Sequence, residues 1–117
     1  MRATDLFVWG FVWHLFADWI LQNDWMARNK SSLLHPAAYV HSGIHFVGLL
    51  LIFSPVWALA IALIHLLIDT RVPLQFWRRI YRQTVMGDVA LHVAMWGDQV
   101  LHITVLAVTA LLVTGLK

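Results

Sequence analysis

The chain lacks cysteine and glutamate entirely, and only 12% of its 117 residues are charged. The absence of cysteine excludes a disulfide scaffold, a thiolate zinc site and a cysteine nucleophile. The absence of glutamate disfavours a di-iron carboxylate bundle of the ferritin type, because glutamates make up most of such a site. An ordinary soluble domain carries about 25% charged residues. A composition this rich in hydrophobic residues also excludes a disordered chain.

Charge is also missing from long continuous stretches. Residues 6–17, 31–68 and 99–116 contain no Asp, Glu, Lys or Arg, while 61% of the whole chain is hydrophobic. A transmembrane helix needs about 20 mostly apolar residues. The sequence therefore predicts one all-α domain over residues 1–117, a polytopic membrane protein with four transmembrane helices at about 5–22, 36–53, 55–71 and 98–114. A soluble four-helix bundle with an apolar surface is the less favoured alternative.

The prolines and one aspartate mark the expected helix boundaries. Pro36 and Pro55 suit the first position of a helix, where a missing N–H is not needed. Asp5 suits an N-cap. Pro73 disfavours helical geometry at the residue before it, so the third helix is expected to end near Arg71.

Residues 74–84 differ from the rest, because apolar and basic side chains fall on opposite sides at helical spacing. Leu74, Trp77 and Tyr81 share one face. This pattern is typical of an amphipathic helix that lies in the membrane interface, and a basic loop is the alternative. The side chains expected near anionic lipid headgroups are Arg71, Arg78, Arg79 and Arg82.

The positions of Lys and Arg predict the topology. With four spans, the connectors 23–35 and 71–96 share one side and carry six of the eight basic residues. The positive-inside rule places these connectors in the cytoplasm and both termini outside, in a multi-pass protein of the bacterial inner membrane. The net charge of +2 does not indicate nucleic-acid binding, since the basic residues lie where topology requires them. The expected partner is the lipid bilayer, and a homo-oligomer stays open.

Histidine and aspartate recur in pairs four residues apart, one pair in each expected span. The pairs are His14 with Asp18, His41 with His45, His65 with Asp69, and Asp98 with His102. Side chains at this spacing share one helix face, about 5–6 Å apart at Cβ, so two of them can reach one ion. Ionisable groups in a bilayer cost about 2.5–3.5 kcal/mol each, and the topology puts all four pairs in the cytoplasmic half. The sequence therefore predicts one polar cluster inside the bundle, with Gln22 and Gln99 beside it.

The five histidines and three aspartates of this cluster suit a divalent Zn, Mn or Fe ion. Eight ligands are too many for one tetrahedral zinc ion, so two ions about 3.5–4 Å apart are one interpretation. One ion with the remaining side chains as hydrogen-bonding neighbours is another. The alternative without metal is a hydrogen-bonded network that holds the helices together.

Three other ionisable residues are expected to lie outside the cluster. Asp88 and His92 are also four residues apart, but the stretch 97–116 already fills the fourth span. We expect this pair outside the hydrocarbon, as a solvated pair on an interfacial helix. His35 precedes Pro36 and is expected to start a helix rather than to bind a metal.

His14-x3-Asp18-x3-Gln22, followed by Asp24-Trp25-Met26-Ala27 and Lys30, resembles the opening of a family of small bacterial and phage membrane proteins known only as a domain of unknown function. The later motifs His65-Leu66-Leu67-Ile68-Asp69 and Asp98-Gln99-Val100-Leu101-His102 match as well, after a second helix that contains histidine. The resemblance is weakest at residues 71–96. It implies a four-helix integral membrane protein and no activity. A more distant similarity, in site chemistry alone, is to membrane-bound metal-dependent hydrolases with His/Asp clusters.

Three functions are compatible with the cluster. The leading one is a metal-dependent hydrolase that acts on a lipid-like or membrane-associated substrate from the cytoplasmic side. The second is a metal-ion or proton transporter or channel, which is disfavoured because residues 6–13, 46–60 and 103–116 offer few polar side chains for an outer pathway. The third is a structural or accessory membrane protein in which the cluster joins helices.

Overall fold

The computed structural model describes residues 1–83 and 87–115, and its regular structure there is entirely helical. In chain order the elements are α1 (Ala3–Leu15), the π-helix η1 (Phe16–Ile20), α2 (Asp24–Asn29), α3 (Pro36–Leu49), α4 (Pro55–Asp69), α5 (Val72–Ile80) and α6 (Asp88–Gly115). The all-α prediction is confirmed. The end of the interfacial helix expected at residues 74–84 and the C-terminal basic residue, Lys117, lie outside the described residues.

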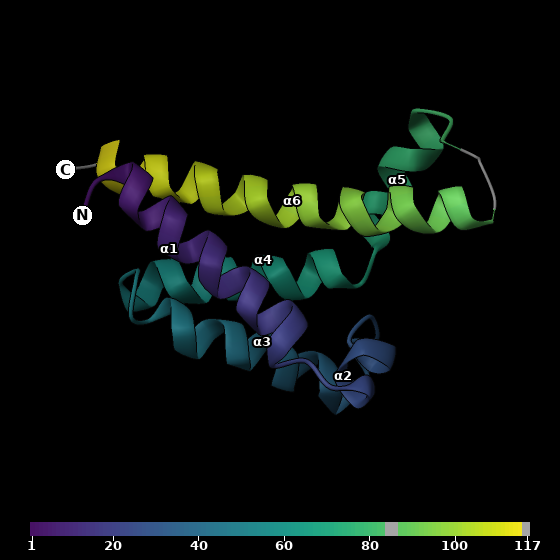
Figure 1. The fold of residues 1–117 in the computed structure, drawn as a ribbon, viewed down its shortest axis with the longest axis horizontal. Helices are drawn as coiled ribbons and strands as arrows, with labels where there is room; N and C mark the ends of the chain where they lie inside the picture. Colours follow the sequence, from purple (N-terminus) through teal and green to yellow (C-terminus); the bar gives the residue numbers. More distant parts are fainter. Residues whose placement is uncertain (84–86, 116–117) are drawn as a thin grey trace.

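The long helices form a bundle. α3 and α4 make a hairpin, and α6 packs against α1 and α4. The start of α1, the end of α6 and the α3–α4 turn lie at one end of the bundle, while α2, α5 and the start of α6 lie at the other (Figure 1). The two polar connectors therefore lie at the same end of the bundle.

Side chains near the helix starts explain several boundaries. Asn23 caps α2 by accepting a hydrogen bond from the Met26 N–H at 2.9 Å. His35 Nδ1 accepts from the backbone N–H of Ala37 at 3.0 Å and so caps α3. Asp5, by contrast, is not the cap of the first helix. That helix begins earlier, at Ala3, and the Asp5 carboxylate reaches back to accept from the Arg2 N–H.

Several predicted helix bounds are wrong. The helix expected at residues 74–84 is α5, which covers Val72–Ile80; it already includes the residue before Pro73, because proline fits the first turn of a helix. The last helix begins at Asp88 and not near Asp98, because Gly97 does not break it. Gly97 instead leaves room for Leu74 of α5, whose side chain lies 2.8 Å from the place where a Cβ on Gly97 would be. α3 ends at Leu49, because the following residues turn and bring Phe53 into the core.

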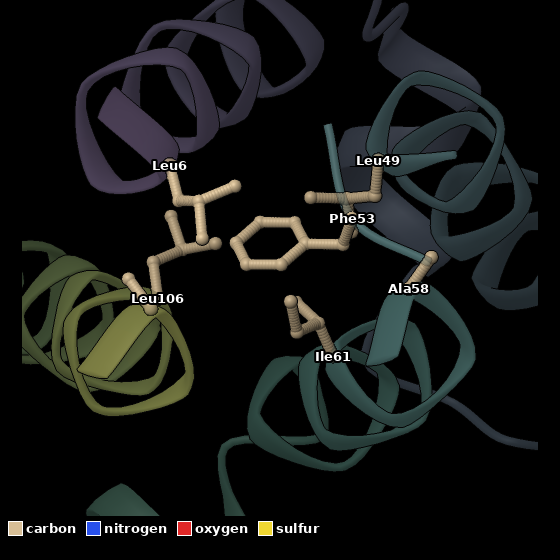
Figure 2. Packing of buried hydrophobic residues seen from close by; sticks show 7 residues of the cluster. Leu6, Leu49, Phe53, Ala58, Ile61 and Leu106 are labelled. Atoms are coloured by element: carbon tan, nitrogen blue, oxygen red, sulfur yellow. The ribbon is translucent and has the colours of Figure 1, made fainter. Parts of the chain in front are cut away.

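An apolar core fills the end of the bundle where α1 begins and α6 ends. Its buried members come from all four long helices and from the α3–α4 turn: Leu6, Leu49, Phe53, Ala58, Ile61, Leu106 and Ala110. Figure 2 shows the Phe53 ring in the middle of this group. The core therefore closes one end of the bundle with apolar packing.

By length and composition, α6 is the one described helix that could cross a bilayer alone. α4 and α5 together, bent by 58° at their junction, would add a second such segment if they form one span. α1, α3 and α4 have 13, 14 and 15 residues, fewer than the about 20 that a hydrocarbon core needs. The helix lengths therefore do not support four membrane-spanning helices. The π-helix ends α1 and a tight turn ends α3, which shortens both.

Gly48 lies at the contact between α3 and α1. A Cβ on Gly48 would overlap the indole of Trp13, whereas a Cβ on Gly43 in the same helix meets no atom within 4 Å. We expect Gly48→Ala to lower the free energy of unfolding by about 1–3 kcal/mol through overpacking. Gly43→Ala should be neutral or stabilising by about 0.5–1 kcal/mol. Thermal unfolding followed by circular dichroism measures both, and equal unfolding temperatures would contradict a close α1–α3 contact at Gly48.

Candidate metal centre

A layer of buried polar side chains lies next to the apolar core. Its members are at most 5% exposed and come from α1, η1, α3, α4 and α6: His14, Asp18, His41, His45, His65, Asp69 and His102. These are seven of the eight residues that the sequence analysis assigned to one cluster. The eighth, Asp98, lies at the edge of the layer with 14% of its side chain exposed. We call the seven buried residues the His/Asp layer.

The Asp18 carboxylate lies close to three histidine side chains, which come from α1 and α3. Its Oδ1 lies 2.9 Å from His45 Nε2 and 3.2 Å from His41 Nε2. Its Oδ2 lies 3.2 Å from His14 Nε2. The neighbouring Trp13 Nε1 donates a hydrogen bond to the backbone carbonyl of His45 at 3.1 Å. This bond holds α1 and α3 together at the level of the layer.

The Asp69 carboxylate also lies close to three histidine side chains, which come from α3, α4 and α6. Its Oδ2 lies 2.8 Å from His65 Nε2 and 3.4 Å from His41 Nε2. Its Oδ1 lies 3.4 Å from His102 Nε2. His41, which is fully buried, therefore lies between the two carboxylates and approaches both with the same nitrogen.

Several of these close approaches are not hydrogen bonds. Within the described part of the chain, the buried atoms without a hydrogen-bond partner include Nε2 of His41, His65 and His102, and Oδ1 of Asp69. The distances of 2.8 Å from His65 to Asp69 and 3.2 Å from His41 to Asp18 are short enough for hydrogen bonds, but the alignment that such bonds need is missing. The two approaches of 3.4 Å to Asp69 are also long for hydrogen bonds. Nearly all buried polar groups in proteins are hydrogen-bonded, so each exception needs an explanation. Ligand atoms that converge without bonding one another are what an ion site requires.

Two groups of side chains in the layer can hold a metal ion. One consists of Asp18, His41, His45 and His65, and the other of His65, Asp69 and His102; within each group the ligand atoms lie within 4.8 Å of one another. The groups share His65. Four ligands match a closed tetrahedral site, and three match an open site with one position left for water or substrate.

His14 and Asp98, which the sequence analysis also proposed as ligands, belong to neither group. His102 Nδ1 lies 2.9 Å from the backbone carbonyl of Asp98 and 3.5 Å from its carboxylate. An imidazole that donates its Nδ1–H in this way leaves Nε2 free to bind an ion. Asp98 therefore orients His102 in this structure.

Of the two glutamines expected beside the cluster, Gln99 makes direct contacts. Its Oε1 lies 2.8 Å from His14 Nε2, and its amide donates to Asp18 Oδ2 at 3.2 Å. Gln99 therefore links α1 and η1 to α6. Gln22 lines a neighbouring pocket, where its buried Oε1 has no hydrogen-bond partner among the described residues.

The chain also matches a known family. A family described as "Protein of unknown function (DUF3307)" matches residues 6–117. The chain belongs to the DUF3307 family. No curated protein and no solved structure matches it. The resemblance stated from the motifs is thus confirmed, and the description of DUF3307 gives the His/Asp layer no activity.

Access to the layer differs between its two sides. Toward the apolar core, the space left between four histidines and the core side chains is about 10 Å³, which is about the room for one water molecule. Toward the connectors, a pocket of about 340 Å³ reaches Asp18 and Asp69. The layer is therefore open on the connector side and closed by apolar packing on the other.

Lys30 is a residue of this site that the sequence analysis did not select. It follows α2 and lines the pocket, and its Nζ lies 3.9 Å from Asp69 Oδ1. No local pattern predicts this contact, because 39 positions separate the two residues in the sequence. From the sequence alone, a lysine within a polar connector indicates only the topology.

Arg71 apart, the other basic and ionisable residues singled out from the sequence lie away from the layer. Asp88 and His92 are exposed, at the start of α6 and not on a separate interfacial helix. Arg78 and Arg79 lie in the last turn of α5. Arg71, in contrast, lines the pocket beside the layer, whereas Arg78 and Arg79 do not.

His41 and His92 form a matched pair of histidines, one fully buried and one exposed. We expect His41→Ala to lower the free energy of unfolding by about 3–5 kcal/mol, because it removes a partner from two buried carboxylates. His92→Ala should change it by less than about 0.5 kcal/mol. Chemical denaturation in detergent measures the difference. Equal losses would contradict the placement of His41 between the carboxylates.

Proposed function

We propose that the chain is a multi-pass protein of the bacterial inner membrane that binds one or two divalent Zn, Mn or Fe ions in the His/Asp layer. In this proposal it uses them to hydrolyse a lipid-like or membrane-associated substrate. The observation that supports it most is the set of buried ligand atoms without hydrogen-bond partners, on His41, His65, His102 and Asp69. They belong to the two groups with metal-binding spacing.

A metal explains the layer better than a hydrogen-bonded network does. Asp18 and Asp69 are 5% and 3% exposed, and a buried carboxylate is strongly unfavourable unless it is paired or bound to a metal. A network would align the imidazole N–H groups on the carboxylate oxygens, but Asp69 Oδ1 and three Nε2 atoms have no aligned partner in the described residues. A divalent ion bound by either group would offset the carboxylate of that group and accept its imidazole lone pairs.

The three-ligand group suits hydrolysis. It leaves one coordination position free, and its Asp69 borders the open pocket. A bound divalent ion supplies a Lewis acid that activates water and polarises a phosphoryl or carbonyl group. Asp98 lines the same pocket, belongs to neither ligand group, and has a buried Oδ1 without a partner among the described residues. It is therefore placed to accept a proton from water as the general base.

The apolar outer surface supports the membrane part of the proposal. Large hydrophobic side chains are more than half exposed on each of the four long helices, for example Val8, Val47, Val56 and Leu111, and this distribution suits contact with lipid. α1 and η1 follow each other directly, so they span 18 residues together. The shorter helices α3 and α4 would require a locally thinned bilayer. In this arrangement the connector side is cytoplasmic.

α5 fits the membrane interface in the same proposal. Phe76, Ile80 and Tyr81 are 59%, 60% and 66% exposed, with Arg78 and Arg79 in the same turns. Exposed aromatic and aliphatic side chains next to arginines suit the headgroup region, where the arginines bind lipid phosphates. The anionic headgroups are thus the proposed partners of Arg78, Arg79 and Arg82.

Transport is the weaker alternative. A transported ion needs a polar path on both sides of its site, and the apolar core closes one side. The residual space of about 10 Å³ between the layer and that core does not provide such a path.

The absence of native cysteine makes the topology directly measurable. We expect Thr4→Cys to react with a membrane-impermeant maleimide in intact cells. Ser31→Cys should react only after the membrane is opened, because the 23–35 connector is placed in the cytoplasm. Labelling of both positions from the same side would contradict the proposed topology.

We expect purified wild-type protein to carry one or two divalent transition-metal ions per chain, measured by elemental mass spectrometry. His65→Ala should lower the content at least tenfold, because His65 is common to both ligand groups and loss of a ligand weakens metal binding. His92→Ala should keep the wild-type content. A metal content near zero in wild-type protein under chelator-free conditions would favour the hydrogen-bonded network.

Hydrolysis is tested by comparing wild-type protein with the variant Asp98→Asn. Metal-loaded wild-type protein should release p-nitrophenol from long-chain p-nitrophenyl phosphates or esters. Asp98→Asn should retain the metal and lower the rate by about 10²–10⁴-fold, as expected for loss of a general base. Full activity of Asp98→Asn would remove Asp98 from the mechanism. Metal binding without turnover of either substrate class by wild-type protein would contradict the hydrolase.

A further inference from the structure

The pocket beside the His/Asp layer has charged side chains of both signs. Its carboxylates are Asp18, Asp69 and Asp98, and its cations are Lys30 and Arg71. Without a metal, the carboxylates outnumber the cations by one. One divalent ion reverses the sign, and a second adds two further positive charges. A metal-loaded pocket is therefore positive overall, and it attracts anions.

We propose that this pocket is the subsite for a phosphate group of the substrate, and that Lys30 and Arg71 bind its oxygens beside the metal. This inference rests on the proposed function, because without a metal the three carboxylates would repel an anion. It narrows the substrate to phosphate esters and makes phosphoryl chemistry, rather than acyl chemistry, the reaction of the centre.

Lys30 is held where a phosphate oxygen would need a donor. Its side chain is only 14% exposed, although lysine is among the side chains that are least often buried. The separation of 3.9 Å between Nζ and Asp69 Oδ1 is too long for a hydrogen bond. The ammonium has three N–H donors, so it can donate to a ligand in the pocket while it stays close to Asp69. Its backbone is fixed as the C-cap of α2 by a hydrogen bond to the Met26 carbonyl at 2.9 Å.

Arg71 is placed at the pocket by an unusual backbone conformation. Its φ of 66° lies in the left-handed region, which residues other than glycine rarely adopt. The conformation allows the chain to bend by 58° between α4 and α5, two positions after Asp69. Strained residues of this kind gather at functional sites. An arginine there brings a planar fork of donors that matches phosphate oxygens.

The size of the pocket agrees with this class of ligand. A volume of about 340 Å³ lies at the lower end of the range of about 300–1,000 Å³ for small-molecule sites. Such a volume holds a phosphate and the first part of the group attached to it. The phosphate can come from a lipid headgroup or from a soluble phosphate ester, and these sources differ in how they reach the pocket.

The test uses the full chain loaded with Mn²⁺ in dodecyl maltoside, which contains no phosphorus. Inorganic phosphate is titrated, and paramagnetic broadening of its ³¹P resonance reports binding next to the metal. Lys30→Met should weaken phosphate binding about tenfold or more, as expected for loss of a hydrogen bond from a charged donor. Arg28→Met, which removes the same charge from α2 outside the pocket, should change it less than twofold. Lys30→Arg should restore most of the binding.

Metal content is measured on every variant, because this measurement distinguishes failure of the proposed metal centre from failure of the proposed phosphate subsite. If wild-type protein and Lys30→Met hold equal Mn²⁺ but bind phosphate equally, the phosphate subsite is wrong and the metal centre stands. If wild-type protein holds no metal, both are wrong. Added phosphatidic acid that competes with phosphate supports the subsite with a lipid source. Phosphate binding that phosphatidic acid leaves unchanged supports it with a soluble source.

Discussion

Two carboxylates buried among apolar helices set the main constraint on this fold. Asp18 and Asp69 are almost inaccessible, and an isolated buried carboxylate is far too unfavourable to persist. Each long helix therefore contributes imidazole groups that face them, and His41 approaches both. The bundle is joined at this layer by polar contacts and at the next layer by the apolar core around Phe53. This division gives the molecule one closed end and one end with access.

The composition of the layer was predictable from spacing. A period of four residues puts two side chains on one helix face. When each of four helices has such a polar face, all four faces can be buried together only in the interior of the bundle. The alternation of helix direction then brings the pairs to one level. His14 and Asp98 show the limit of the argument. Spacing brings them to the layer, but whether a side chain binds an ion or orients its neighbour depends on the distances and angles.

The entrance to the layer was much less predictable. Lys30 reaches Asp69 because α2 packs back against α3, and Arg71 enters the pocket because the chain takes a left-handed residue there. Neither event has a local sequence signal, since both depend on how separate elements pack. The start of α6 was missed for a related reason. The sequence analysis placed Asp88 and His92 on a separate interfacial helix, yet Gly97 packs against Leu74 and a single helix continues through it.

The π-helix explains one further difference between the two sides of the layer. The backbone N–H of Leu21 bonds to the carbonyl of Phe16, five residues back, so this turn contains one residue more than an α-helical turn. One extra residue shifts the phase of the following chain by about 100°, the rotation per residue of an α-helix. His14, Asp18 and Gln22 would otherwise form a single row along α1. The wider turn at Asp18 and the end of the helix at Ile20 interrupt that row. His14 and Asp18 are buried in the layer, and Gln22 lines the entrance pocket.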